Sequence, residues 1–317
     1  MDFVGKRNWF FLISSLVILV GIVSLLLPHG LNAGLEFSGG SSMTLEFQGD
    51  VAQEGLRSQF AALGHPDAVI QRLGEGSFFV RTRTLEESQS GGPSERERIV
   101  SALEANLGSG VVISDFFSVS PTIASETVRN AVVIVVIASV AILLYITFAF
   151  RRVPTPFRYG TSAVVALIHD VAVMLGVFSI AGRVFDLEVN AMFIVAVLTI
   201  MGYSVHDTIV VIDRIRENLT RGIGRDLSAT INISIQDTIG RSLNTSLTVL
   251  FSLLALLLFG GATIRDFMIA LLIGIIVGSY SSIWIASQLL IVWEKGDVVK
   301  LFRRLRHPRP RVDRAAL

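Results

Sequence analysis

The sequence predicts an α-helical membrane protein in which a small ferredoxin-like α+β domain lies between the first and second of six membrane-spanning helices. Three observations predict this fold class. Of the 317 residues, 51% are hydrophobic and only 17% are charged, whereas soluble domains carry about 25% charged residues. The apolar residues form six long runs. Between the first two runs, residues 29–126 change to the shorter periodicities of strands and surface helices.

Each of the six runs is long enough to cross a hydrocarbon core about 30 Å thick, which takes roughly 20 helical residues. They cover residues 9–27, 127–150, 157–181, 190–212, 242–259 and 267–292. The first run resembles a signal peptide because it follows Lys6 and Arg7. It exceeds the usual apolar length of about 7–15 residues, however, and no small-residue cleavage site follows it. Residues 1–28 are therefore expected to be a retained cytoplasmic N-terminus and first span.

The basic residues of the short loops lie on one side of the predicted membrane. They precede the first span and fill the loops after the second and fourth spans, and more follow in the tail, residues 294–317. In the short loops of the other side, Arg183 and Arg265 stand beside acidic residues. Because cytoplasmic loops carry the excess of Lys and Arg, both termini are predicted to be cytoplasmic. The tail is expected to contact anionic lipid, and residues 29–126 are expected outside.

The external segment has the order of elements of a ferredoxin-like domain. Strands are predicted over residues 42–48, 68–73, 77–84 and 111–119, and helices over residues 51–63 and 94–107. The second helix opens with Ser94 and has Glu97 three residues later, which is a capping-box pattern. The order β-α-β-β-α-β defines a split βαβ fold. The charged residues here are mostly acidic, so nucleic acid is not an expected partner.

Four ionisable residues fall within the predicted spans of residues 127–293, or at the start of one. They are His169, Asp170, Asp207 and Arg241. A charge at the bilayer centre costs about 2.5–3.5 kcal/mol on insertion scales, which makes each of them a candidate functional residue. At 1.5 Å per residue, Asp207 lies about 25 Å from the outer face and Arg241 about 28 Å, so the two are able to pair. His169 and Asp170 lie about 15 Å deep, near the midplane.

Structural explanations compete with the functional ones. Arg241 could extend its side chain to the headgroups from a helix end. Against this, Arg241, Asn244 or Thr245, Thr248 and Ser252 recur at helical spacing and form a polar stripe that implies a protein or water-filled interior. Asp207 could be a paired structural carboxylate. His169 and His206 could be hydrogen-bonded core histidines, and for His206 we favour that interpretation. Asp170 is the hardest to explain structurally because it is the deepest.

Proton relay is the chemistry that suits this set. Desolvation disfavours a charged carboxylate and a nearby Arg favours it, so movement of the Arg changes the affinity for a proton. Histidine at the midplane could shuttle protons. A metal site is a weak alternative, because no H-E-x-x-H motif is present and neighbouring helical residues point about 100° apart. The absence of cysteine excludes disulfide, thiol and Cys-zinc chemistry. No catalytic triad or phosphate-binding loop is found.

Four motifs in the chain resemble the SecD/SecF family. They are LNAGLEFSGG at residues 31–40, ALIHDV at residues 166–171, the stretch from MGYSVHD to REN at residues 201–218, and RSLNTS at residues 241–246. The chain is similar in length and in number of spans to the shorter subunit of the family. It departs from the usual pattern at Glu36, Ser120 and His206, and no role is assigned to His206.

The resemblance implies an RND-type bundle that pairs with a SecD-type subunit and uses the proton motive force to help preproteins leave the SecYEG channel. The membrane-embedded Asp and Arg of the family correspond to Asp207 and Arg241. It also implies a bacterial or archaeal cell membrane, a coupling proton in place of any cofactor, and no enzymatic activity. Half of an RND-type exporter of small molecules or lipids is the alternative function. A membrane scaffold without transport is a third.

Overall fold

The computed structural model of the chain describes residues 2–28, 30–86, 92–107, 110–153, 155–261 and 264–294. These residues form two compact units. One comprises residues up to Asn32, 134–187 and those from 192 onward, and the other comprises residues 33–133 and 188–191. The predicted basic tail lies outside the described residues, apart from Glu294.

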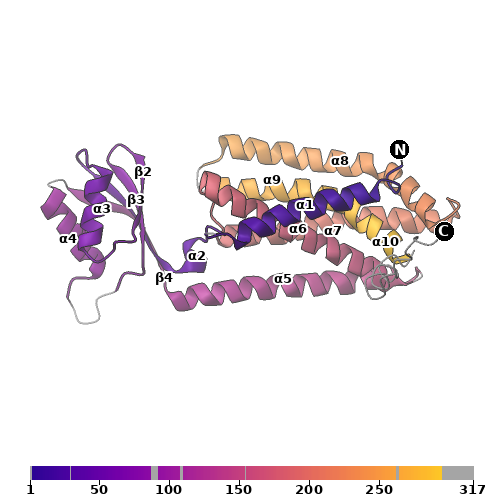
Figure 1. The fold of residues 1–317 in the computed structure, drawn as a ribbon, viewed down its shortest axis with the longest axis horizontal. Coiled ribbons are helices and arrows are strands. Elements are labelled where there is room, and N and C mark those ends of the chain that lie inside the picture. The colour runs from indigo at the N-terminus through magenta and orange to yellow at the C-terminus, as the bar shows by residue number, and fades with distance from the viewer. Residues whose placement is uncertain are drawn as a thin grey trace, which may run out of the picture. The chain divides into compact units, whose positions relative to one another are not determined.

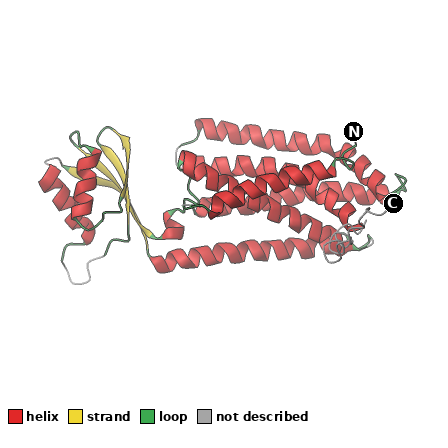
Figure 2. Cartoon of the chain, in the orientation of Figure 1, coloured by secondary structure: helices red, strands yellow, loops and turns green. Residues whose placement is uncertain are grey.

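Six helices are long and apolar enough to cross a membrane, which confirms the six predicted spans. They are α1 (Arg7–Leu26), α5 (Pro121–Ala149), α6 (Pro156–Phe185), α7 (Ala191–Thr220), α8 (Leu227–Phe259), and a last span built from α9 (Arg265–Ser281), the π-helical η2 (Ser282–Ala286) and α10 (Ser287–Glu294). Figures 1 and 2 show α1, α6, α7, α8 and the last span running side by side. Helix α5 has residues in both units.

Two spans begin earlier than the hydropathy predicts. Helix α5 starts at Pro121 rather than at residue 127, and α8 starts at Leu227 rather than at residue 242. The start of α8 is fixed by Asp226, whose side chain accepts a hydrogen bond of 2.8 Å from the Ala229 N–H. An Asp cap satisfies a free backbone donor at a helix start whether or not the first turns are apolar. Hydropathy therefore located the apolar part of each helix and not its first residue.

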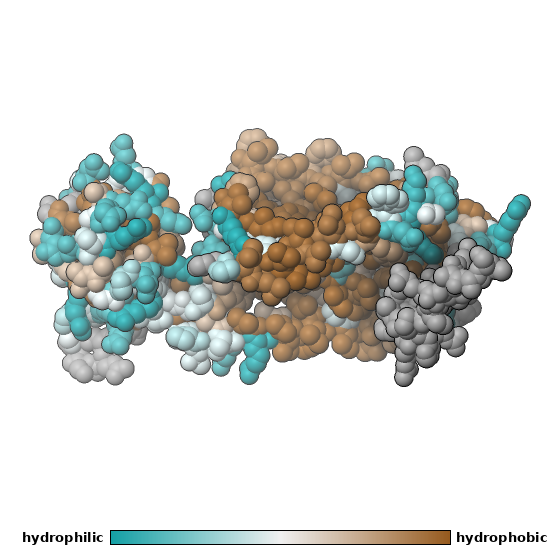
Figure 3. Space-filling view, viewed as in Figure 1, coloured by the Kyte–Doolittle hydropathy of each residue, from teal (hydrophilic) through white to brown (hydrophobic). Residues whose placement is uncertain are grey.

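Three of the six spans form the interior of the helical unit. About half or more of α6, α7 and the last span is buried, whereas α1, α5 and α8 are mostly exposed. Figure 3 shows a broad hydrophobic surface over the middle of the helices on the face in view. Such a surface fits lipid or another membrane protein, because there is no water in the bilayer core for polar groups to contact.

Helices α1 and α6 cross at small residues. A Cβ atom on Gly21 would lie only 2.8 Å from the Cα atom of Gly176. One turn further, the hydroxyls of Ser24 and Ser179 share a hydrogen bond of 2.7 Å. Arg183 closes this end of the crossing by donating to the Ser24 carbonyl, 2.5 Å away. Close approach at small residues is the usual way for helices to associate in lipid, where no hydrophobic force brings them together.

The second unit, called the external unit after its predicted position, contains a four-stranded antiparallel sheet with the strand order β2-β3-β1-β4. Its strands are β1 (Gly40–Phe47), β2 (Val69–Gly74), β3 (Ser77–Thr82) and β4 (Val111–Val119), and its helices are α3 (Gln53–Ala62) and α4 (Glu95–Leu107). With β1 and β3 in the middle, this is the predicted ferredoxin-like arrangement, which is confirmed. Ser94 and Glu97 form the predicted capping box, with N–H to side-chain bonds of 2.8 and 3.3 Å.

Alternation along β1 places Met43, Leu45 and Phe47 on the buried face of the sheet. They pack with Phe60 of α3 and Leu103 of α4 in one hydrophobic core. A β-bulge between Thr44 and Leu45 shifts the pairing with β4 by one residue. Side chains in a strand change faces at every residue, so the bulge keeps the apolar residues of both strands on the core side.

The motif at residues 31–40 ties the start of the external unit to the short segment before α7. Gly34 donates its N–H to the Val189 carbonyl at 2.8 Å. Arg81 of β3 pairs with Glu188 at 3.0 Å and donates to the Ala33 carbonyl at 2.6 Å. The short helix α2 (Leu35–Ser38) follows, and the sequence had not indicated it. This motif is therefore structural in the external unit.

A buried histidine with polar neighbours lies beside β3. His65 is only 2% exposed, its Nδ1 lies 2.9 Å from the Thr82 hydroxyl, and its Nε2 lies 3.1 Å from Glu95 Oε1. Burial lowers the pKa of His65 below its ordinary value of 6.5, against the opposing effect of Glu95. Although burial acts to raise it, the pKa of Glu95 is lowered overall by the hydrogen bond from the Glu86 N–H and by the charge of His65.

Replacing Gly21 by Leu should destabilise the helical unit, because the new side chain would meet the backbone of Gly176, which cannot move aside as a flexible side chain can. Overpacking of this kind costs about 1–3 kcal/mol. We expect a lower midpoint of thermal unfolding in detergent. The control is Gly202→Leu, since a Cβ atom at Gly202 would have nothing within 4 Å. Equal melting of the two variants would contradict the close crossing.

The external unit should lose stability as the pH falls below 6.5. Between pH 6.5 and the lowered pKa of folded His65, the unfolded chain binds a proton that the folded chain does not. Stability that is present at neutral pH is therefore lost in this window. NMR titration of the His65 ring should give a pKa below 6.5, and His65→Gln should flatten the pH dependence of amide exchange in β3. A titration midpoint above 6.5 would refute this.

Candidate functional site

The deepest predicted charge, Asp170, is enclosed by its own helix and by α7. Asp170 is 1% exposed, and Ser204 of α7 donates a hydrogen bond of 2.7 Å to its Oδ2 atom. The Oδ1 atom lies 3.0 Å from Nδ1 of the neighbouring His169. Both carboxylate oxygens therefore have a partner within this chain. His169 is also buried, and its other ring nitrogen, Nε2, has no partner among the described residues.

Ser282 connects this carboxylate site to the π-helical segment of the last span. Its hydroxyl donates to the Ser204 carbonyl at 2.9 Å and accepts from the Thr208 hydroxyl at 2.9 Å. A π-helical turn inside an α-helix is often found at a functional site. Here it begins at Ser282, whose side chain bonds across to α7 instead of to its own helix. Asp170, Ser204, Thr208 and Ser282 thus form one buried polar network across α6, α7 and η2.

Glycines of α9 make room for this network. A Cβ atom on Gly278 would lie 3.1 Å from the Ser204 Cβ and 3.7 Å from Asp170 Oδ2. A Cβ atom on Gly274 would collide with the Ile200 side chain. The two positions are four residues apart and so lie on the same face of α9. The short distance between α9 and α7 therefore requires the smallest residue at both.

Asp207 lies on α7 close to a second group of polar side chains. It is 3% exposed. Its Oδ2 atom and the hydroxyl of Ser242 on α8 are both buried, and the two side chains are close enough to interact, but neither atom makes a well-formed hydrogen bond among the described residues. Nearby, Tyr203 donates to Ser246 at 3.0 Å, and Ser246 shares a bond of 2.6 Å with Ser279. Asp207 is thus buried and incompletely satisfied, in contrast to Asp170.

Arg241 does not meet Asp207 in this structure. The described residues contain no ion pair between them, and Arg241 is exposed. It lines a hollow of about 430 Å³ at the end of the bundle where α7 turns into α8, together with Asp213, Glu217 and Asp237. The pairing of Asp207 with Arg241 stays a prediction.

The predicted polar stripe on α8 faces outward from this chain. Asn244, Thr245, Thr248 and Ser252 are all exposed, so the stripe lines no interior of this bundle. The hydroxyls of the two threonines bond to carbonyls of their own helix, at 3.0 Å for Thr245 and 2.8 Å for Thr248. Those side chains therefore cost little in an apolar environment. The charge of Arg241 and the amide of Asn244 have no such partner among the described residues.

The expectation that His206 is a core histidine is wrong, because its side chain is exposed on α7. It lies next to the buried Asp207 in sequence, and consecutive helical residues point about 100° apart. The charged residues thus fall into an inward-facing set and an outward-facing set.

Sequence inspection assigned no role to the hydroxyl residues of the polar contacts, of which Ser204 bonds to Asp170. Ser204, Thr208, Ser246 and Ser282 are all buried and all take part in these contacts. The first three lie within the family motifs at residues 201–218 and 241–246, and Ser282 ends the run Ser-Tyr-Ser-Ser at residues 279–282 of an otherwise apolar span. Serine is common enough in membrane helices that this run by itself indicates packing rather than a site.

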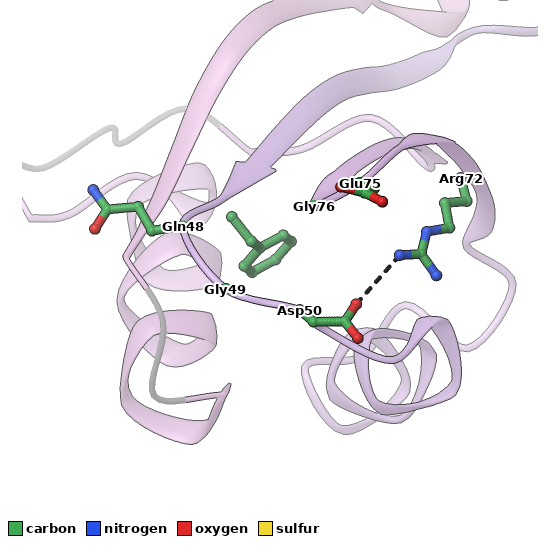
Figure 4. A pocket seen from close by; sticks show the side chains of 7 residues that line it. Gln48, Gly49, Asp50, Arg72, Glu75 and Gly76 are labelled. Atoms are coloured by element: carbon green, nitrogen blue, oxygen red, sulfur yellow. Dashed lines mark hydrogen bonds and ion pairs between the residues drawn. The ribbon is translucent and has the colours of Figure 1, made fainter.

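A shallow hollow also lies in the external unit. It measures about 430 Å³ and is lined by Phe47, Gln48, Gly49, Asp50, Arg72, Glu75 and Gly76 (Figure 4). Its Arg72 already pairs with Asp50 at 3.2 Å and donates to the Gly74 carbonyl at 3.2 Å. Exposed ion pairs of this kind contribute little.

Two carboxylates, those of Asp170 and Asp207, are buried inside the helical unit. Among the described residues, neither Asp170 nor Asp207 forms an ion pair with Arg or Lys. A carboxylate anion buried without a cation is costly, and protonation removes that cost. Six membrane helices that enclose protonatable groups define a polytopic membrane protein with an internal polar network.

The chain belongs to the SecD/SecF family of protein-export membrane proteins. The family model for the C-terminal region of "Protein export membrane protein SecD/SecF" matches residues 99–296. A protein of Thermobaculum terrenum named "Protein translocase subunit SecF" is 43% identical over 311 residues, which is 96% of this chain and 97% of that protein. The family resemblance predicted from the motifs is confirmed.

Longer relatives contain a region like this chain within one polypeptide. "Protein translocase subunit SecDF" of Bacillus subtilis is 36% identical over 94% of this chain and 39% of its own length. The crystal structure of SecDF from Thermus thermophilus matches with a TM-score of 0.74 at 33% identity, over 93% of this chain and 39% of that one. This chain therefore spans about two fifths of those proteins.

Replacing Ser204 by Ala should destabilise the helical unit by leaving Asp170 Oδ2 without its donor. Loss of one bond to a buried polar group costs about 1–3 kcal/mol. The measurement is the free energy of unfolding in mixed micelles. Ser162→Ala is the control, because Ser162 is also fully buried on α6 but donates only to its own helix, at Arg158 O. If both variants lose the same stability, the bond to Asp170 has no special weight.

Proposed function

We propose that this protein is an auxiliary subunit of the Sec protein-export machinery, and that with a SecD-type partner it uses the proton motive force to promote the passage and release of preproteins. The observation that carries the coupling step is Asp207, a buried carboxylate with one unpartnered oxygen inside a membrane-spanning helix. The names of the relatives, which are translocase subunits, support the export role. No catalytic activity is assigned to the chain.

A partner subunit follows from the outward-facing polar groups. Arg241 and Asn244 are exposed on α8, a helix whose apolar part would otherwise face lipid. An arginine in hydrocarbon is costly unless protein or water surrounds it. We assign the covering surface to a SecD-type subunit, in agreement with the fused SecDF relatives. On this proposal the assembled pair places groups of the partner opposite Arg241 and beside Asp207.

The coupling step is a change in charge at Asp207. When Asp207 binds a proton, the buried charge disappears, and so does its attraction for a nearby cation such as Arg241. When the proton leaves, the charge must again be stabilised. Each state favours a different arrangement of α7 against α8 and the partner, so the proton gradient can drive movement between them. One charge moved across 100 mV is worth about 2.3 kcal/mol.

The orientation follows from the positive-inside rule, which puts both termini in the cytoplasm and the external unit on the outer side. There the external unit would contact preproteins as they leave the SecYEG channel. This side has no ATP supply, so a proton-driven device suits the work.

Asp207→Asn should abolish the proton-dependent stimulation of export while the complex with the partner still assembles. Asparagine has nearly the shape of aspartate but cannot bind and release a proton. The measurement is preprotein translocation into inverted vesicles with and without a proton gradient. The control is Asp266→Asn, a carboxylate in the first turn of α9.

Unchanged stimulation by the gradient in Asp207→Asn would remove Asp207 from the coupling. If the chain instead supports drug or lipid efflux without the partner, it belongs to an exporter of small molecules. If replacing all four of His169, Asp170, Asp207 and Arg241 by neutral residues leaves export unchanged, the protein is a scaffold.

A further inference from the structure

Three residues of the last span recur every four positions and lead from the Asp170 site toward the end of the bundle where α1 begins. They are Tyr280, Trp284 and Gln288. Residues four apart are neighbours on one side of a helix. The first of them stacks on His169, with ring centroids 6.3 Å apart, and the second packs against the first at 5.2 Å. His169 is in turn bonded to Asp170.

Buried polar atoms without partners accumulate along this line. Gln288 has 0% exposure, yet neither its Oε1 nor its Nε2 has a hydrogen-bond partner among the described residues. The same holds for Trp284 Nε1 and His169 Nε2, which are also buried. Four unpaired polar atoms on one route form a concentration that native proteins normally avoid, because each costs about 1–3 kcal/mol.

Helices α1 and α6 form the other walls of this route. The Tyr280 hydroxyl donates to the Phe10 carbonyl of α1 at 2.9 Å and accepts from Ser14 at 3.4 Å. The segment η2–α10 contacts α6, whose buried residues in the half nearer Pro156 include Ser162, Ala163 and Ala166. The route is therefore bounded by the last span, α1 and α6 of this chain.

We propose that His169, Tyr280, Trp284 and Gln288 line a chain of internal water molecules that connects Asp170 with the end of the bundle where α1 begins. Buried waters typically make about three hydrogen bonds to polar groups that otherwise lack partners. The route offers a ring nitrogen, a phenol, an indole N–H and both ends of an amide. The presence of this water chain is independent of the role proposed for Asp207.

The chemistry of the route suits proton access to Asp170. Histidine can take a proton at one ring nitrogen and release one from the other. His169 holds Asp170 with Nδ1 and presents Nε2 to the route. Water and the Gln288 amide complete the path to the end of the helix. The suggestion that protons move along the route rests on the proposed proton coupling. The suggestion that water fills the route does not.

X-ray radiolytic footprinting tests for the water directly, because water bound beside a side chain generates the radical that labels it. The full chain would be studied in lipid nanodiscs with its partner subunit. Each labelling rate is divided by the rate in the denatured chain. We expect Tyr280 and Trp284 to label several-fold faster than Phe178 and Phe193, which form a buried aromatic pair with centroids 4.6 Å apart.

Gln288→Leu is the decisive variant, since it has a similar volume but no polar atoms. It should lower labelling of Trp284 several-fold and leave Phe178 unchanged, whereas Gln288→Asn should keep labelling near the original rate. The water chain would be overturned if Trp284 and Tyr280 label as slowly as Phe178. It would also be overturned if Gln288→Leu leaves the labelling of Trp284 unchanged. Neither result concerns Asp207. Loss of gradient-dependent export in Asp207→Asn together with unlabelled Trp284 would uphold the proposed function and refute the water chain.

Discussion

The arrangement of the helical unit depends on keeping the buried Asp170 carboxylate hydrogen-bonded to side chains of this chain. A buried carboxylate that loses a donor costs several kcal/mol, so the groups around it are held in place. Ser204 must come within 2.7 Å of it, and that brings α7 against α6. Gly278 must stay without a side chain for α9 to fit beside both. Ser282 then bonds the Ser204 carbonyl, at the point where the last span changes to a π-helical turn.

The two buried carboxylates of this chain differ in how many of their oxygens have a hydrogen-bond partner within the chain. Both oxygens of Asp170 have partners within the chain. Asp207 keeps an oxygen without a partner, and the nearest helix beyond it, α8, carries Arg241 and Asn244 on its exposed side. A fully hydrogen-bonded carboxylate needs no further partner, whereas one with an unpartnered oxygen next to an exposed polar face leaves room for groups from elsewhere. The proposed SecD-type partner therefore belongs at α8.

Packing and polar chemistry use the same small residues in this bundle. Gly21 and Gly176 let α1 and α6 approach closely, and Ser24 and Ser179 bond across that crossing. Serines do the same between α7, α8 and the last span. Lipid offers helices no hydrophobic reason to associate, so close packing and interhelical hydrogen bonds must hold them. This explains why buried hydroxyl groups are common in this bundle. The same serines and threonines that allow close packing also form the polar network.

The sequence by itself determined the six spans, the βαββαβ order of the external unit, its capping box, the family and the four intramembrane residues, because hydrophobic period, turn chemistry and motif are local properties. It did not determine the helix starts at Pro121 and Leu227, which depend on caps and packing beyond the apolar run. It also misplaced His206 and, although it put Asp170 and Asp207 at different depths, it did not show how either is hydrogen-bonded. Which face of a helix meets which neighbour is a property of the packed bundle. Only the tertiary structure, by placing Ser204 beside one carboxylate and leaving an oxygen of the other without a partner, decided that the two lie in different surroundings.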